Sequence, residues 1–240
     1  MFALAKNSHW LQTQVVKLIA GLHPAIDHNV SKIAGLKKSF YLANMESLPG
    51  DYVEFGMFEG TSFIGAFESH MRTRQPDTGP RAFWGFDSFG GFKYTSGDDA
   101  HPFFREGDFQ SSYAKTKQRI AHHFKDRAKW TITPGYVEDT IGGKSAPAFG
   151  IEKIAVAFID VDLGEPARVA LDFLRPALQP GSIVILDDYF AYRGSMKRGV
   201  AGAFANFQKA HPELQFRRLF DYGQGGQGFI LGDIANAPTA

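Results

Sequence analysis

The first fifth of the chain has the apolar periodicity of amphipathic helices. Apolar residues recur every three to four positions in residues 8–22 and again in residues 28–46. Pro24 separates the two segments, because proline breaks a helix interior. We expect residues 1–48 to form a helical extension that either caps a binding site or contacts a second copy of the chain.

After the Pro49-Gly50 turn the pattern changes to short apolar runs that alternate with helical segments. This alternation predicts one domain over residues 49–240, with a parallel sheet and helices on both faces. The expected strands are residues 52–56, 82–87, 129–133, 154–160 and 182–187, and the expected helices are residues 61–74, 112–125, 165–178 and 195–210.

The end of the chain departs from this alternation. Two further strands are expected at residues 215–220 and 228–231, with only a short glycine-rich connection between them. Because parallel strands need a long crossover, these two must pair antiparallel. We therefore expect a Rossmann-like α/β fold in which a mostly parallel, seven-stranded sheet ends in an antiparallel hairpin.

Composition narrows the possible classes of protein. The formal net charge of this 240-residue chain is +1, which argues against a dedicated nucleic-acid binder. Cysteine is absent, so disulfides, zinc–thiolate sites and thiol catalysis are excluded, and a cytoplasmic location is favoured. No run reaches the roughly 18 apolar residues of a membrane helix, and the N-terminus lacks the apolar core of a secretory signal. We expect partners other than nucleic acids or membranes.

Two of the expected strands end in acidic residues. One apolar run leads to Asp160 and Asp162, and the other leads to Asp187-Asp188. Ligands of open parallel sheets bind at the carboxyl ends of the strands, and Mg²⁺ prefers carboxylates together with water and substrate oxygens. The pairing predicts a hard-cation site and chemistry on an oxygen-bearing substrate. The alternative is that these acids cap turns and helices, although carboxylates that converge without a cation would repel each other.

A glycine motif follows the first strand of the domain. Glu54, Gly56 and Gly60 form the pattern acid-x-Gly-x-x-x-Gly, which lacks the middle glycine of a dinucleotide fingerprint. The Glu54 carboxylate would repel a phosphate, but it suits a cationic group such as the amino group of S-adenosylmethionine. Asp87, at the end of the second strand, is placed to accept both ribose hydroxyls of a nucleoside. An ordinary strand–turn–helix junction, with Asp87 capping a turn, is the alternative.

Four sequence blocks together resemble the macrocin O-methyltransferase family, and the resemblance covers about residues 50 to 230. The blocks are Val53-Glu54-Phe55-Gly56 to Ser62, Gly85-Phe86-Asp87-Ser88-Phe89, Pro134-Gly135-Tyr136-Val137-Glu138-Asp139-Thr140, and Ile159-Asp160-Val161-Asp162-Leu163 with Asp187-Asp188-Tyr189. The resemblance implies the class I methyltransferase fold. It also implies Mg²⁺- and S-adenosylmethionine-dependent methylation of a hydroxyl of a small molecule, which we expect to be a sugar of a natural product.

The resemblance also implies roles for individual residues. The residues expected to bind the cofactor are Glu54, Gly56 and Gly60 with Thr61 or Ser62 at its methionine part, Asp87 with Ser88 at its ribose, and Gly135 and Tyr136 near its adenine. The residues expected to bind Mg²⁺ are Asp160, Asp187 and Asp188. Asp162 lies on the same side of its strand as Asp160, one step further out.

The expected catalytic residues are Asp160 and His101. A metal that binds the acceptor oxygen would lower the pKa of the hydroxyl and orient it toward the sulfonium methyl group. Because the transfer is an SN2 displacement, positioning is the main catalytic contribution. His101 could complete the deprotonation as a general base; the alternative is a solvated loop histidine.

Residues 88–110 form a loop rich in glycine, aspartate and phenylalanine, and we expect it to recognise the acceptor. Its aromatic residues either form a lid that excludes water or pack against the sheet edge; they are Phe89, Phe92, Tyr94, Phe103 and Phe104. Members of the family often have tyrosine where this chain has Gly164, so the resemblance leaves the shape of the acceptor pocket open.

Several other functions compete with this interpretation. A catechol-type acceptor is the main rival to a sugar, because a similar set of acids suits vicinal aromatic hydroxyls. A nicotinamide-dependent oxidoreductase is disfavoured by the missing glycine, and a metal-dependent hydrolase by the lack of a histidine-rich ligand set. A non-catalytic scaffold with the same fold is the remaining alternative. The expected partners are a small-molecule acceptor and a second copy of the chain in a homodimer.

Overall fold

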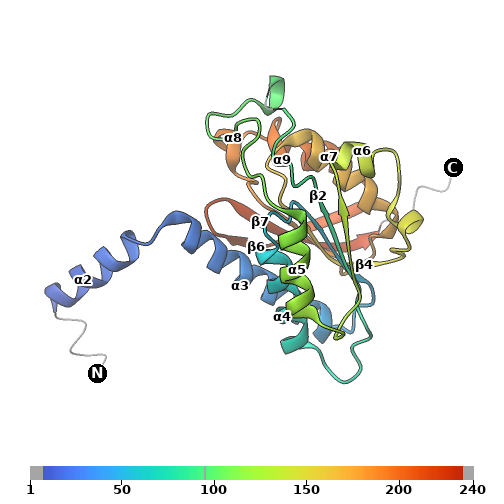
Figure 1. The fold of residues 1–240 in the computed structure, drawn as a ribbon, viewed down its shortest axis with the longest axis horizontal. Helices are drawn as coiled ribbons and strands as arrows, with labels where there is room; N and C mark the ends of the chain where they lie inside the picture. Colours follow the sequence, from blue (N-terminus) through green and yellow to red (C-terminus); the bar gives the residue numbers. More distant parts are fainter. Residues whose placement is uncertain (1–7, 95, 235–240) are drawn as a thin grey trace.

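The computed structural model describes residues 8–94 and 96–234, and within them it forms one sheet of seven strands. The strands are β1 (Asp51–Phe55), β2 (Phe83–Asp87), β3 (Trp130–Pro134), β4 (Ile154–Ile159), β5 (Ile183–Leu186), β6 (Leu214–Tyr222) and β7 (Gly226–Ile234). They are ordered β3-β2-β1-β4-β5-β7-β6 (Figure 1). The strands β1 to β5 pair in parallel, whereas β7 pairs antiparallel with both β5 and β6. The predicted seven-stranded sheet with its antiparallel C-terminal hairpin is confirmed.

Helices surround this sheet and precede it. They are α2 (His9–Ala20), α3 (Pro24–Met45), α4 (Thr61–Thr73), α5 (Tyr113–Phe124), α6 (Val137–Thr140), α7 (Gly164–Leu174), α8 (Ala191–Gly194) and α9 (Gly199–Ala210), with the short 3₁₀ helices η1 (Gly97–Asp99), η2 (Ala146–Phe149) and η3 (Arg175–Ala177). None of the described helices combines the length and apolar character that crossing a membrane requires.

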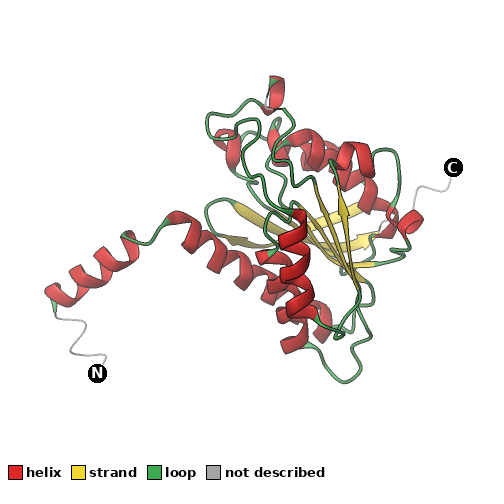
Figure 2. Cartoon of the chain, viewed as in Figure 1, coloured by secondary structure: helices red, strands yellow, loops and turns green. Residues whose placement is uncertain are grey.

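The sheet lies between two layers of helices (Figure 2). On one face, α3, α4 and α5 pack against it, and the stacked rings of Phe67 and Phe124 lie 4.0 Å apart in that core. On the other face, α7 and α9 cover it, and Phe173 packs edge-on against Phe55 of β1. Because both faces are covered, every residue of β4 is buried, which explains its uninterrupted apolar sequence.

The N-terminal helices differ from each other in burial. Helix α2 has no buried residue and projects away from the rest of the molecule (Figure 1). Helix α3 buries Leu36 and Phe40 of its second half in the core. Pro24 begins α3 instead of lying in a gap before it, because proline is tolerated in the first turn of a helix. The role of residues 1–48 as a cap or an oligomer contact stays a prediction.

Acid sensitivity is expected from a histidine inside the α4 layer. The side chain of His70 is buried, and its Nδ1 has no hydrogen-bond partner among the described residues. Burial, followed by the charge of Arg81, lowers the pKa of His70 to about 4. Since the unfolded chain takes up this proton near pH 6.5 and the folded one does not, stability should fall as the pH drops from 6.5 toward 4. The loss at pH 5 should be about 2 kcal/mol.

Urea unfolding at pH 7.5 and pH 5 tests this expectation. The variant His70→Leu should lose less stability than the wild type between these two pH values, whereas His122→Leu, at an exposed position of α5, should lose as much as the wild type. An equal pH dependence in His70→Leu and the wild type would contradict the assignment.

Candidate active site

The strand order changes direction between β1 and β4, which is where ligands bind in open parallel sheets. From β1 the chain builds outward to β2 and β3, then returns to β4 on the other side, so the loops after β1 and β4 leave in opposite directions. Gly56 follows β1 at this point with φ of +81°, and a Cβ there would overlap the carbonyl oxygen of Asp160. Only glycine lets the two strand ends come this close.

A cavity of about 670 Å³ opens at this edge of the sheet. It joins several of the residues that were predicted from the sequence: Gly56, Asp87, Ser88 and Tyr136 of the cofactor set, and Asp160, Asp187 and Asp188 of the metal set. The other predicted residues are not among those that line it: Glu54, Gly60, Thr61, Ser62, Gly135 and His101. The structure thus brings one part of the predicted site together around a single cavity.

Asp87 is held rigidly at the end of β2. Its Oδ2 accepts a hydrogen bond from the amide of Phe58 at 2.7 Å, and its Oδ1 accepts one from the amide of Phe89 at 2.5 Å. Burial raises the pKa of this carboxyl group, although the backbone donors oppose that effect. These contacts connect the loop after β1 to the loop after β2 and orient a carboxylate at the cavity wall.

Glu54, on β1, is not among the residues that line the cavity. Its side chain is fully buried and accepts hydrogen bonds of 2.5 Å from the hydroxyls of Tyr52 and Ser62. Burial raises its pKa to about 7, and the hydrogen bonds from Ser62 and Tyr52 oppose that effect. In this structure Glu54 and Ser62 support the loop that carries Gly56, and their cofactor roles stay predictions.

The remaining residues of the predicted cofactor set make local contacts. Gly60 precedes α4 with φ of +77° and packs against Ile120, and exposed Thr61 accepts a hydrogen bond of 3.0 Å from Arg119. Gly135, with φ of +129°, donates its amide to the carbonyl of Asp87 at 2.9 Å and so places Tyr136 at the cavity wall.

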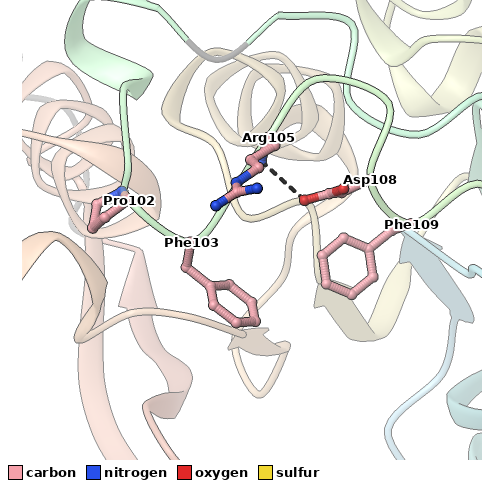
Figure 3. Close-up of a pocket in the computed structure, with 5 residues that line it drawn as sticks. All are labelled: Pro102, Phe103, Arg105, Asp108 and Phe109. Atoms are coloured by element: carbon pink, nitrogen blue, oxygen red, sulfur yellow. Dashed lines mark hydrogen bonds between the residues drawn. The ribbon is translucent and has the colours of Figure 1, made fainter.

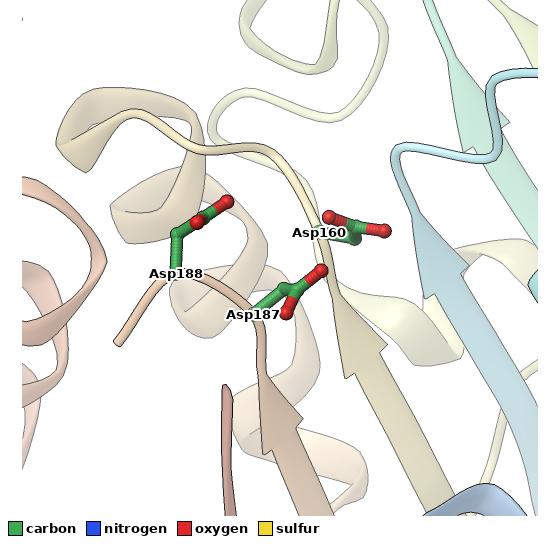
Figure 4. Close-up of side chains that lie close together, drawn as sticks. All are labelled: Asp160, Asp187 and Asp188. Carbon is green, nitrogen blue, oxygen red and sulfur yellow. The ribbon is translucent and has the colours of Figure 1, made fainter. Parts of the chain in front are cut away.

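Three carboxylates converge where β4 and β5 end (Figure 4). Asp160, Asp187 and Asp188 each offer an oxygen, and these oxygens all lie within 4.8 Å of one another. Asp162 and Asp188 adopt positive φ values of +60° and +49°, a backbone conformation that is uncommon for residues other than glycine. Burial, followed by the charge of Asp188, raises the pKa of Asp162.

Three further side chains hold the acids, and sequence reasoning missed all of them. The Lys32 ammonium donates to Oδ2 of Asp160 and lies equally close, at 2.6 Å, to Oδ2 of Asp187. The Nε2 of His28 lies 3.1 Å from the same oxygen of Asp187, and the Tyr222 hydroxyl donates to Oδ1 at 2.8 Å. The spacing of His28 and Lys32, four residues apart in an expected helix, was the available signal, since it puts both on one face.

The electrostatics of the cluster follow from these contacts. Burial alone would raise the pKa of Asp187, but Lys32 and His28 hold it well below its usual range. Burial and the charge of Asp187 raise the pKa of Asp160. For Lys32 burial acts to lower the pKa, and the two carboxylates outweigh it and hold that pKa well above its usual range. Lys32 therefore forms a buried ion pair with both Asp160 and Asp187.

His101 belongs to a packed part of the loop over residues 88–110. Its ring stacks on Phe104 at 4.4 Å and meets Tyr192 edge-on at 4.8 Å, and its Nδ1 accepts a hydrogen bond from the amide of Phe103. Burial lowers its pKa. His101 is not among the residues that line the cavity. Its role as a base stays a prediction.

The aromatic residues of this loop divide between the two expected arrangements. Phe92, Tyr94 and Phe103 line the cavity, as does Phe109, whereas Phe89 and Phe104 are buried. Phe103 and Phe109 also border a smaller hollow of about 390 Å³, together with Pro102, Arg105 and Asp108 (Figure 3).

The loop is attached to α7 by a helix cap. Asp99 accepts hydrogen bonds from the amides of Gly164 and Glu165 at 2.6 and 3.3 Å, and Arg198 donates to the carbonyls on either side of Asp99. A Cβ at Gly164 would lie 3.1 Å from Oδ1 of Asp99. The glycine at this position thus makes room for the loop to approach the acidic residues.

The strand order, the terminal antiparallel hairpin and the site at the carboxyl edge define a class I methyltransferase architecture. Two solved structures share it: the O-methyltransferase NovP, with a TM-score of 0.66 and 20% identity over 85% of this chain and 80% of that one, and the calicheamicin methyltransferase CalS11, with a TM-score of 0.66 and 22% identity over 97% and 90%.

The family model of macrocin-O-methyltransferase (TylF) matches residues 29–215. The chain therefore belongs to the macrocin-O-methyltransferase family, as its sequence blocks suggested.

Two curated relatives come from Streptomyces. One, from Streptomyces olivaceus, is an 8-demethyl-8-(2,3-dimethoxy-α-L-rhamnosyl)-tetracenomycin-C 4'-O-methyltransferase, 31% identical over 69% of this chain and 64% of its own length. The other, from Streptomyces niveus, is a demethyldecarbamoylnovobiocin O-methyltransferase, 29% identical over 60% of this chain and 54% of its own length. The chain thus matches less than two thirds of either relative.

Proposed function

We propose that this protein is an S-adenosylmethionine- and Mg²⁺-dependent O-methyltransferase that methylates a sugar hydroxyl of a natural product. The observation that carries the proposal is the single cavity that joins Asp87 and Tyr136 to the acids Asp160, Asp187 and Asp188. Membership of the macrocin-O-methyltransferase family supports the reaction type. The names of the two Streptomyces relatives give a rhamnosyl tetracenomycin and demethyldecarbamoylnovobiocin as acceptors; both support a natural product, and the first supports a sugar.

The residues at one end of the cavity fit a nucleoside sulfonium cofactor, which would supply the methyl group. Gly56 lines the cavity with backbone alone, because the space that a Cβ would fill is taken by the carbonyl of Asp160. Asp87 presents a fixed carboxylate suited to two vicinal hydroxyls, and the Tyr136 ring offers a surface for a base. Ser88 lies in the loop between them, where its hydroxyl already bridges Gly90 and Gly91.

The residues at the other end fit a hard divalent cation. Asp160, Asp187 and Asp188 supply only oxygen ligands, which Mg²⁺ prefers. Such an ion would lower the pKa of an acceptor hydroxyl and fix its position.

The chain's own contribution is to hold the acidic residues in place and to orient the acceptor. Tyr222 and His28 fix the Asp187 carboxylate, which keeps the acidic cluster in place. Asp160 takes part in the reaction as a ligand of that cation, since its carboxylate lines the cavity together with those of Asp187 and Asp188. His101 is assigned no proton in this proposal, because its ring packs against Phe104 and Tyr192 and is not among the residues that line the cavity.

The N-terminal helices have two proposed roles. The start of α3 caps the site, since His23, Pro24 and Asn29 line the cavity together with His28 and Lys32. Helix α2 contacts a second copy of the chain in a homodimer, a role supported by its exposed apolar side chains, among them those of Trp10, Leu18 and Ile19.

The function is tested by incubating the protein with methyl-labelled S-adenosylmethionine and two sets of acceptors, aromatic natural products that carry deoxysugars and simple catechols. We expect label on a sugar hydroxyl in the presence of Mg²⁺, and no label after treatment with EDTA until Mg²⁺ is restored. If only the catechols are labelled, the proposed acceptor is a catechol-type compound and not a sugar. Transfer that is unaffected by EDTA would remove the metal from the proposal.

A further inference from the structure

Lys32 places a positive charge inside the acidic cluster, although it belongs to a helix and the acids follow strands of the sheet. It belongs to α3, and its side chain is only 11% exposed. Its ammonium lies 2.6 Å from Oδ2 of Asp160 and 2.6 Å from Oδ2 of Asp187, and 5.3 Å from the centre of the Phe158 ring. A lysine that is buried this far is stabilised by its paired carboxylates.

The lysine and a divalent cation compete for the same acidic residues. Two of the three acids that would hold the metal are the two that Lys32 bridges. A Mg²⁺ ion needs ligand oxygens at about 2.1 Å, and an ammonium group between the same carboxylates leaves no room for it. Two cations at one point would also repel strongly in a site with little solvent.

We propose that Lys32 is an internal cation that fills the metal site and is displaced when a divalent ion binds. This inference rests on the proposed function in taking the acids as metal ligands. Lys32 stabilises the metal-free protein, because it neutralises carboxylates that would otherwise repel. It also weakens metal binding, because the ion must first remove it.

Displacement of Lys32 should also affect α3, whose first half lines the cavity. The His28 ring bridges two elements: its Nε2 lies 3.1 Å from Asp187, and its Nδ1 accepts the amide of Gln224 at 3.1 Å. The side chain of Gln224 in turn donates to Asp27 of α3 at 3.0 Å. Lys32 and these contacts attach the first half of α3 to the acids and to the turn between β6 and β7. Loss of the Lys32 contact on metal binding therefore loosens the helix that covers the site.

Titration of the metal-free protein with Mn²⁺, followed by calorimetry and by the electron paramagnetic resonance of free Mn²⁺, tests the proposal without any turnover. The variant Lys32→Met keeps the apolar stem and removes the charge. It should bind Mn²⁺ with a Kd about tenfold lower than the wild type, because no internal cation competes. The control is Lys37→Met, at an exposed position of the same helix, which should bind as the wild type does.

The outcomes separate this inference from the proposed function. If the wild type binds Mn²⁺ and Lys32→Met binds it with an equal or higher Kd, Lys32 does not compete with the metal. The proposed role of the acidic residues as metal ligands is then unaffected. Binding by none of the three proteins overturns both.

A second measurement uses the unaltered protein, in case the variant does not fold. Hydrogen exchange followed by mass spectrometry should show faster exchange in residues 24–31 after Mg²⁺ is added. Unchanged or slower exchange there would contradict the displacement.

Melting temperatures of the two variants provide a third measurement. In EDTA, Lys32→Met should melt at a lower temperature than Lys37→Met, and added Mg²⁺ should narrow this difference in melting temperature.

Discussion

Replacement of Asp187 by asparagine is expected to lower Mg²⁺-dependent methyl transfer by about a thousandfold or more while leaving cofactor binding largely intact. Asparagine keeps the shape of the side chain and can still accept the Tyr222 hydroxyl, so the fold around the site should persist. It removes, however, the charge that Lys32 and His28 now contact and that the divalent cation would need. Asp160→Asn should behave in the same way, since it removes a second member of the cluster.

The measurement is the initial rate of label transfer at saturating S-adenosylmethionine and Mg²⁺, with the melting temperature of each variant as a check on folding. The exposed acid Asp126, in the turn after α5, provides the matched control Asp126→Asn, which should turn over at the wild-type rate. Undiminished activity in Asp187→Asn and Asp160→Asn would exclude these residues as metal ligands.

Much of the fold could be predicted because its determinants are local. The alternation of apolar runs and helical segments defines the parallel strands, and the short connection before Gly228 allows only an antiparallel hairpin. The convergence of Asp160 with Asp187 follows from the same logic, since β4 and β5 are parallel neighbours whose carboxyl ends meet. Residues at the ends of adjacent strands can thus be brought together from sequence alone.

Contacts between distant elements could not be predicted in this way. Lys32 and Asp160 are separated by 128 residues, and nothing in the periodicity of α3 says which strand end its polar face meets. The course of the loop over residues 88–110 depends on Asp99 capping α7, a contact made 65 residues away along the chain. The sequence therefore could not show that the His101 ring stacks on Phe104 and meets Tyr192 edge-on, and its role as a base stays a prediction.

Asp87→Ala is expected to weaken binding of S-adenosylhomocysteine by about a hundredfold or more. If Asp87 accepts both ribose hydroxyls, the variant loses two charge-assisted hydrogen bonds, each contributing about 1.5–3 kcal/mol. The same carboxylate accepts the amides of Phe58 and Phe89, so the loops at the cavity should also loosen. Asp87→Asn, which retains one acceptor, separates these two effects, and equal melting temperatures would exclude a general loss of folding.

Calorimetric titration of the wild type and Asp87→Ala with S-adenosylhomocysteine, with and without Mg²⁺, tests the central claim most directly, because it needs no knowledge of the acceptor. We predict that the wild type binds one equivalent under both conditions and that Asp87→Ala binds at least a hundredfold more weakly. Absence of binding to the wild type, with and without Mg²⁺, would contradict the methyltransferase assignment.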